Sequence, residues 1–120
     1  DNQQRAISAQ DLRDMLVSTL GALPYVAKSA TYTATESDVV VDVTTGASAI
    51  TINLPAVATT RVGKWYLLRK ADAAAGSIVA DPNASETING ATTKSVTTQN
   101  NALLVINTGA AWMGFTLTGA

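Results

Sequence analysis

The sequence predicts a mainly β protein: an antiparallel β-sandwich or jelly-roll-like domain of about nine short strands, preceded by an N-terminal arm and one short α-helix. Apolar and polar side chains alternate over residues 49–54, with Ile50, Ile52 and Leu54 on one side, as in a half-buried strand. Turn-forming residues recur at intervals of roughly 8–12 residues, a spacing typical of sandwiches and barrels. Threonine, which suits strands and keeps a sheet face polar without charge, occurs 17 times among the 120 residues. A chain of this length supports one domain with one core.

The N-terminal part of the chain differs in composition from the rest. Residues 1–30 are predicted to form an arm, an anchoring helix and a linker, and residues 31–120 the β-domain. Residues 1–6 are polar and contain no residue that would build a core, so we expect an extended arm that becomes ordered on a partner surface.

A helix is predicted over residues 9–20. Ser8 is a suitable N-cap, and Asp11, three positions later, completes a variant of the capping box. Gly21 is suited to the C-cap and Pro24 prevents continuation of the helix.

One side of this helix carries an apolar stripe. Ile7 precedes the N-cap at the spacing of a hydrophobic staple with Leu12. The stripe consists of Leu12, Met15, Leu16 and Leu20. A helix of about three turns with so narrow a stripe is marginal alone. It must therefore pack on the β-domain, on the same helix of sister chains or on a host protein.

The β-domain is predicted from alternating or apolar runs separated by turn residues. Asn89 and Gly90 are the clearest hairpin residues, because a type I′ turn requires positive φ at both central positions. The predicted strands lie at residues 31–35, 39–43, 49–54, 64–70, 77–80, 86–88, 91–93, 94–98, 102–106 and 112–117.

The strand at 64–70 is apolar on both faces, because Trp65, Tyr66, Leu67 and Leu68 follow one another. A strand of this kind is covered on both sides. We expect the second cover to be another sheet, a helix or another subunit. Trp65, Tyr66, Trp112 and Phe115 are expected to be core residues.

Composition excludes several classes of function. Charged residues make up 14% of the chain, against about a quarter in ordinary soluble domains, which favours faces that pack against other subunits. The net charge is −1 with no basic cluster, so nucleic-acid binding is not expected. The sequence contains no cysteine and no histidine, so it predicts no disulfide and no metal site built on those residues. The apolar runs are too short for a membrane span, and neither a membrane span nor a signal peptide is expected.

No catalytic constellation is present in the sequence. Catalytic triads need histidine or cysteine, and the chain has no P-loop or dinucleotide-binding glycine motif. Asp38 and Asp42 share one face of a strand, but the supporting carboxylates of a calcium site or a glycosidase are missing nearby. Asp72 and Asp81 are expected to serve as turn residues. We therefore expect no enzymatic activity and no cofactor.

Four short motifs carry a family resemblance. They are Ile-Thr-Ile-Asn-Leu-Pro at 50–55, Gly-Lys-Trp-Tyr at 63–66, Thr-Ile-Asn-Gly at 87–90 and Asn-Thr-Gly-Ala-Ala-Trp at 107–112. In this order they resemble a β-module that recurs in bacteriophage virion proteins, namely tail fibres, head fibres and capsid decoration proteins. The likeness covers about residues 31–117, and the segment 5–14 looks like the anchoring segments that precede such modules. The resemblance implies a trimeric, non-enzymatic part attached to a capsid or tail. Because the sequence has no further fibre shaft, receptor-binding tip or enzymatic domain, it favours a decoration or head-fibre protein, unless the chain is a fragment.

The expected function follows from the resemblance and the N-terminal segment. The chain is expected to form a homotrimer on the virion and to dock on the major capsid protein, or on another virion protein, through residues 1–21. The residues expected to dock are Arg5, Ile7, Leu12, Arg13, Met15, Leu16 and Leu20. The alternative is a tail-fibre or receptor- or carbohydrate-binding module, for which Tyr25, Tyr32 and Trp65 are the candidate contacts.

Overall fold

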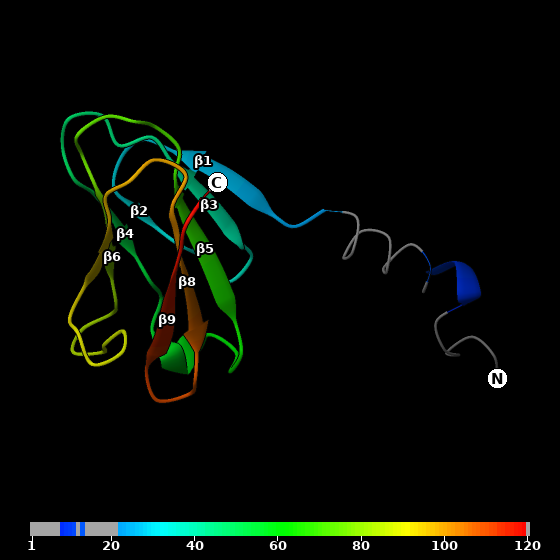
Figure 1. Cartoon of the computed structure of the whole chain (residues 1–120). Helices are drawn as coiled ribbons and strands as arrows, with labels where there is room; N and C mark the ends of the chain where they lie inside the picture. The colour runs from blue at the N-terminus through cyan, green and yellow to red at the C-terminus, as the bar shows by residue number, and fades with distance from the viewer. Residues whose placement is uncertain (1–7, 12, 14–21, 120) are drawn as a thin grey trace.

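The protein is a sandwich of two mixed β-sheets (Figure 1). The structure is a computed structural model of the chain and describes residues 8–11, 13 and 22–119. The five-stranded sheet has the order β1 (Tyr25–Lys28), β3 (Val40–Val43), β5 (Trp65–Lys70), β8 (Ala102–Asn107) and β9 (Trp112–Leu117). The four-stranded sheet has the order β2 (Tyr32–Thr33), β4 (Ile50–Asn53), β6 (Ile78–Asp81) and β7 (Lys94–Val96). A short 3₁₀-helix, Val57–Thr59, follows β4. The predictions of a mainly β fold and of about nine strands are confirmed.

The prediction of antiparallel sheets is wrong for the first six strands. Strands β1 to β6 alternate between the two sheets, and β1, β3 and β5 pair in parallel, as do β2, β4 and β6. Each segment crosses to the opposite sheet before it returns, so it re-enters its own sheet in the same direction. The result is a stack of coils, in which Val40 pairs with Leu67 and Ile50 with Ile78. Antiparallel pairing is limited to β5–β8–β9 and β6–β7.

The core lies between the two sheets. Tyr66 and Trp112 are its largest apolar members, with exposed fractions of 0% and 1% and ring centroids 5.8 Å apart. Ile52 and Leu54 are buried as the alternation over 49–54 predicts. The expectation that Trp65 and Phe115 are core residues is wrong. Trp65 is half-buried on the outer side of β5, and Phe115 lies on the outer side of β9 and is 48% exposed. The buried apolar residues are Ala34, Val41, Val43, Ile52, Leu54, Tyr66, Leu68, Ile78, Ala80, Ile88, Val96, Ala102, Leu103, Val105 and Trp112.

The sandwich begins at Tyr25. Strand β1 pairs with β3 although it lies within residues 1–30, which the sequence assigns to the arm, helix and linker. In the N-terminal part, residues 9–11 and 13 are helical. The Asp11 backbone N–H donates to Ser8 Oγ at 3.0 Å, and the Ser8 N–H donates to Asp11 Oδ2 at 3.3 Å. The predicted capping box is thus confirmed.

The turn at Asn89-Gly90 is also confirmed. Asn89 has φ 51° and Gly90 has φ 84°, as a type I′ turn requires, and Ile88 and Ala91 exchange both backbone hydrogen bonds at 2.8 and 2.9 Å. The flanking segments 86–88 and 91–93 form only this one antiparallel bridge rather than two strands.

We predict that Gly90→Val lowers the stability of the domain by about 1–3 kcal/mol, because valine is strained at positive φ. No atom lies within 4 Å of the position of an added Cβ, so the loss would come from the backbone alone. Thermal unfolding should show a melting temperature lower by roughly 4–8 °C for each kcal/mol. Thr92→Val, an exposed change beside the turn, is the control and should have little effect. An unchanged melting temperature for Gly90→Val would contradict the assignment of the turn.

Candidate interaction surface

The outer face of the five-stranded sheet is apolar across its whole width. One row of directly paired residues crosses all five strands: Tyr25, Val40, Leu67, Leu104 and Phe115. Tyr25 is 58% exposed and Phe115 is 48% exposed, at the two opposite edges of the sheet. Alternation explains this face, because Tyr66 and Leu68 on β5 point into the core and Leu67 therefore points outward.

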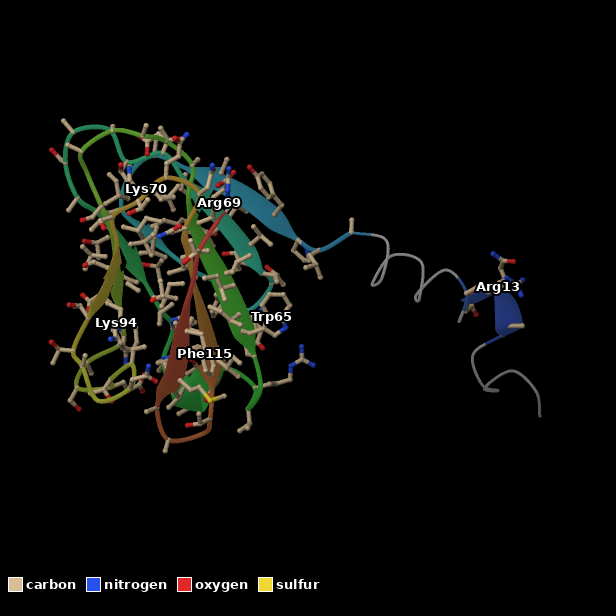
Figure 2. The ribbon with its side chains drawn as sticks, viewed as in Figure 1. Arg13, Trp65, Arg69, Lys70, Lys94 and Phe115 are labelled. Atoms are coloured by element: carbon tan, nitrogen blue, oxygen red, sulfur yellow. The ribbon has the colours of Figure 1, made fainter. Side chains whose placement is uncertain are left out.

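Two further rows flank this one. Trp65, Ile106 and Met113 are paired towards one end of the sheet, and Ala102 pairs with Leu117 towards the other. Figure 2 labels Trp65 and Arg69 on β5 and Phe115 on β9, which belong to this sheet. We call the following set the apolar face: Tyr25, Val40, Trp65, Leu67, Leu104, Ile106, Met113, Phe115 and Leu117.

The charged residues that the described strands place on this outer face neutralise each other. Arg69 Nη1 donates to Asp42 Oδ1 at 2.7 Å, and the Tyr25 hydroxyl donates to Asp42 Oδ2 at 2.6 Å. The second nitrogen of Arg69, Nη2, donates to Asn100 Oδ1 at 2.8 Å. The hydrogen bond to Asp42 raises the pKa of Tyr25, with a smaller contribution from burial. The apolar face thus ends in a paired, electrically neutral cluster rather than in free charge.

The outer face of the four-stranded sheet has a different chemistry. Its pairs place Thr33 beside Asn53 and Asp81, and Thr51 beside Val79, which in turn pairs with Ser95. Val79 is the one large apolar residue on this side of the described strands. The two outer faces of the sandwich therefore differ. Large apolar side chains gather on the outer face of the five-stranded sheet and not on that of the four-stranded sheet.

Of the predicted docking residues, only Arg13 is among the residues that the structure describes. Arg13 is exposed, and its Nη2 donates to Gln10 Oε1 at 2.7 Å within the helical segment. Arg5, Ile7, Leu12, Met15, Leu16 and Leu20 lie outside the described residues. Their docking role stays a prediction.

The candidate sugar contacts do not form one platform. Tyr25 and Trp65 belong to the five-stranded sheet, whereas Tyr32 begins the four-stranded sheet, where Lys28 Nζ lies 4.1 Å from its ring centroid. Trp65 is half-buried and lines a hollow of about 340 Å³ together with Arg61, Val62, Gly63 and Lys64.

The carboxylates of Asp38 and Asp42 have different hydrogen-bond partners. Asp38 is buried and accepts hydrogen bonds from the Tyr32 hydroxyl at 2.6 Å and from the Thr35 N–H at 2.9 Å. Burial would raise the pKa of Asp38, but these donors outweigh it and the pKa is lowered. Asp42 is held by Tyr25 and Arg69, so Asp38 and Asp42 do not share a site. Within residues 8–11, 13 and 22–119 no group of three or more His, Cys, Asp or Glu residues could hold a metal.

Sequence reasoning missed a buried ammonium group at the end of β5. Lys70 is fully buried, and its Nζ donates to Thr45 Oγ1 at 2.8 Å, to Asp72 Oδ1 at 2.9 Å and to the Ala74 carbonyl at 2.9 Å. Asp72 also accepts from the Gly46 N–H at 2.9 Å, and this bond, followed by those of Lys70 and Thr45, lowers the pKa of the Asp72 carboxyl. The cluster joins the end of β5 to two loops at one end of the sandwich, the β3–β4 loop and the β5–β6 loop. Alternation along β5, which puts Lys70 on the core side with Tyr66 and Leu68, is the signal that could have found it.

No protein-family model matches this sequence, and no curated protein is significantly similar to it. Among the helices that the structure describes, none has the length and apolarity to cross a membrane.

Proposed function

We propose that this chain is a non-enzymatic structural protein of a bacteriophage virion, a homotrimeric capsid decoration (cement) or head-fibre protein. The apolar face of the five-stranded sheet is the observation that carries the proposal. Removing such a surface from water is favourable, and contiguous apolar patches of this kind mark interaction sites. The resemblance of the four sequence motifs to phage virion proteins supports the choice of a bacteriophage particle as the assembly to which the protein binds.

The proposal involves two separate interfaces. The β-domain associates with its own copies, and residues 1–21 attach the assembly to the major capsid protein or to another virion protein. Three linked N-terminal segments bind far more tightly than one, because the second and third attachments become intramolecular. Attachment to the assembled shell, and not to its free subunits, then stabilises the shell by mass action.

The alternative function is a tail-fibre module or a receptor- or carbohydrate-binding module. The hollow beside Trp65 favours it, because an aromatic side chain next to the cationic Arg61 and Lys64 would suit an acidic sugar. The two functions differ in what the protein binds. A decoration protein binds particles, whereas a receptor-binding module binds host cells.

Particle binding tests the docking segment. The full chain should co-sediment with virus particles that lack it. Leu16→Asp should abolish this binding, since burial of an unpaired carboxylate costs several kcal/mol, which is at least a hundredfold in affinity. Ser18→Asp is the matched control, because helical spacing puts residue 18 on the side opposite the stripe.

Circular dichroism of each free variant shows whether the β-domain remains folded. A folded Leu16→Asp protein that still co-sediments normally would refute the docking role of the stripe. Binding of the full chain to host cells but not to particles would favour the alternative function.

A further inference from the structure

We infer that the apolar face is the surface on which a second copy of this chain packs. The inference rests on the proposed function, because it names the surface that the proposed self-association uses.

The sheet alone provides about half of the area that a standard interface buries on each partner. Two strands of four residues and three of six, about 4.8 Å apart and at about 3.3 Å per residue, give a footprint of roughly 400 Å². A footprint of this size lies within the range of the largest apolar patch on a typical monomer, roughly 300–600 Å², and such a patch is often functional. A standard interface buries about 800 Å² per partner, so the contact must include neighbouring apolar groups. Leu23, 47% exposed, precedes β1, and Val62, 72% exposed, lies beside Gly109 in the turn between β8 and β9.

The residue types are those that interface cores favour. Tyrosine, tryptophan, phenylalanine, methionine and arginine are enriched there, while lysine, glutamate, aspartate, serine and alanine are depleted. The one aspartate that the described strands place on this face, Asp42, is paired with Arg69. This side of the sheet carries Tyr25, Trp65, Met113, Phe115 and Arg69, and its described strands place no lysine or glutamate on it. A second copy packed on Trp65 and Leu67 would supply the second cover that is expected for the strand at 64–70.

The neutral charge of the apolar face favours a partner whose own surface is apolar and neutral. Asp42 and Arg69 neutralise each other, so the face offers no net charge to attract an acidic or basic partner. A second apolar, neutral face is complementary to it, and another copy of this chain supplies one. The most exposed apolar groups stand at the two unlike edges, Tyr25 on β1 and Met113, Phe115 and Leu117 on β9. One edge of a copy can therefore meet the other edge of its neighbour, as a cyclic assembly requires.

Light scattering on the full chain, measured at two different concentrations in the micromolar range, tests the inference. The wild-type protein should have about three times the chain mass of 12.4 kDa. Phe115→Lys, on the exposed edge strand β9, and Leu104→Lys, on the neighbouring interior strand β8, should each raise the dissociation constant at least a hundredfold and give a monomer. Val79→Lys is the matched control, because it puts the same charge on the outer face of the other sheet and should leave the mass unchanged.

Circular dichroism and thermal unfolding select the variants that are folded, and Phe115 is exposed enough that its replacement should leave the monomer intact. The inference is overturned by a monomeric wild-type protein, by a folded Phe115→Lys variant that keeps the wild-type mass, or by Val79→Lys dissociating the assembly equally. A wild-type monomer that self-associates only after deletion of residues 1–21 would show that the chain's own N-terminal segment covers the face, which also overturns it.

The same measurements separate this inference from the proposed function. A dimer that dissociates through Phe115→Lys and Leu104→Lys alone supports the inference and refutes the homotrimer. An assembly that these variants dissociate, but that does not sediment with particles, supports the inference and refutes the role on the virion.

Discussion

Replacement of Lys70 by alanine is expected to lower the melting temperature by roughly 10–40 °C. The ammonium group is fully buried and makes three hydrogen bonds, one of them to the carboxylate of Asp72. Its removal leaves a cavity and deprives Thr45, Asp72 and Ala74 of a shared donor. Breaking a buried ion pair on one side costs about 3–5 kcal/mol.

Thermal unfolding followed by circular dichroism measures this effect. Lys94→Ala is the control, because Lys94 is an exposed lysine on β7 (Figure 2) and its loss should change little. Lys70→Met keeps most of the volume without the donors, so it separates packing from hydrogen bonding and should fall between wild type and Lys70→Ala. A Lys70→Ala protein that melts within a few degrees of the wild type would show that the two loops hold together without this cluster.

Gly76→Ala is expected to destabilise the domain by about 2–4 kcal/mol. Gly76 is buried, and a Cβ added there would stand 2.2 Å from the Ser48 carbonyl oxygen and 2.6 Å from the Gly46 carbonyl oxygen. Both obstacles are backbone atoms, so the loops must separate. Separation breaks the 2.8 Å bond from the Gly76 N–H to the Gly46 carbonyl and disturbs the neighbouring bond from the Gly46 N–H to Asp72.

Chemical denaturation gives the free energy of unfolding for this variant. Ala75→Ser, an exposed change in the same loop, is the matched control and should alter stability by less than about 0.5 kcal/mol. If Gly76→Ala were as stable as the control, the close approach of the two loops would be refuted.

Local features of this fold could be predicted from sequence, and long-range ones could not. The capping box at Ser8 and the turn at Asn89-Gly90 depend on residues within a few positions of each other, and both are present. The direction of pairing is not local. Ile52 alternates with its neighbours in the same way whether β4 is parallel or antiparallel to its partner.

The candidate surface shows the same limit. The apolar character of both sides of β5 predicted that Leu67 would need a cover. The row that joins Leu67 to Tyr25 and Phe115 depends on the order β1-β3-β5-β8-β9, which no short motif encodes. Lys70 could be placed on the core side by alternation, but its partner Thr45 comes from a turn 25 residues earlier.

Because the strands form stacked coils, contacts differ in how much chain entropy is lost when they form during folding. The β8–β9 hairpin closes across the few residues between Asn107 and Trp112, whereas Val40 meets Leu67 and Ile50 meets Ile78 only after a whole coil has been drawn in. The entropy lost on closing a coil rather than the hairpin is greater by roughly 2 kcal/mol, and none of it is recovered until the parallel pairs have formed. The antiparallel C-terminal end is therefore the natural nucleus, on which β5, then β3, then β1 add in the reverse of their order along the chain.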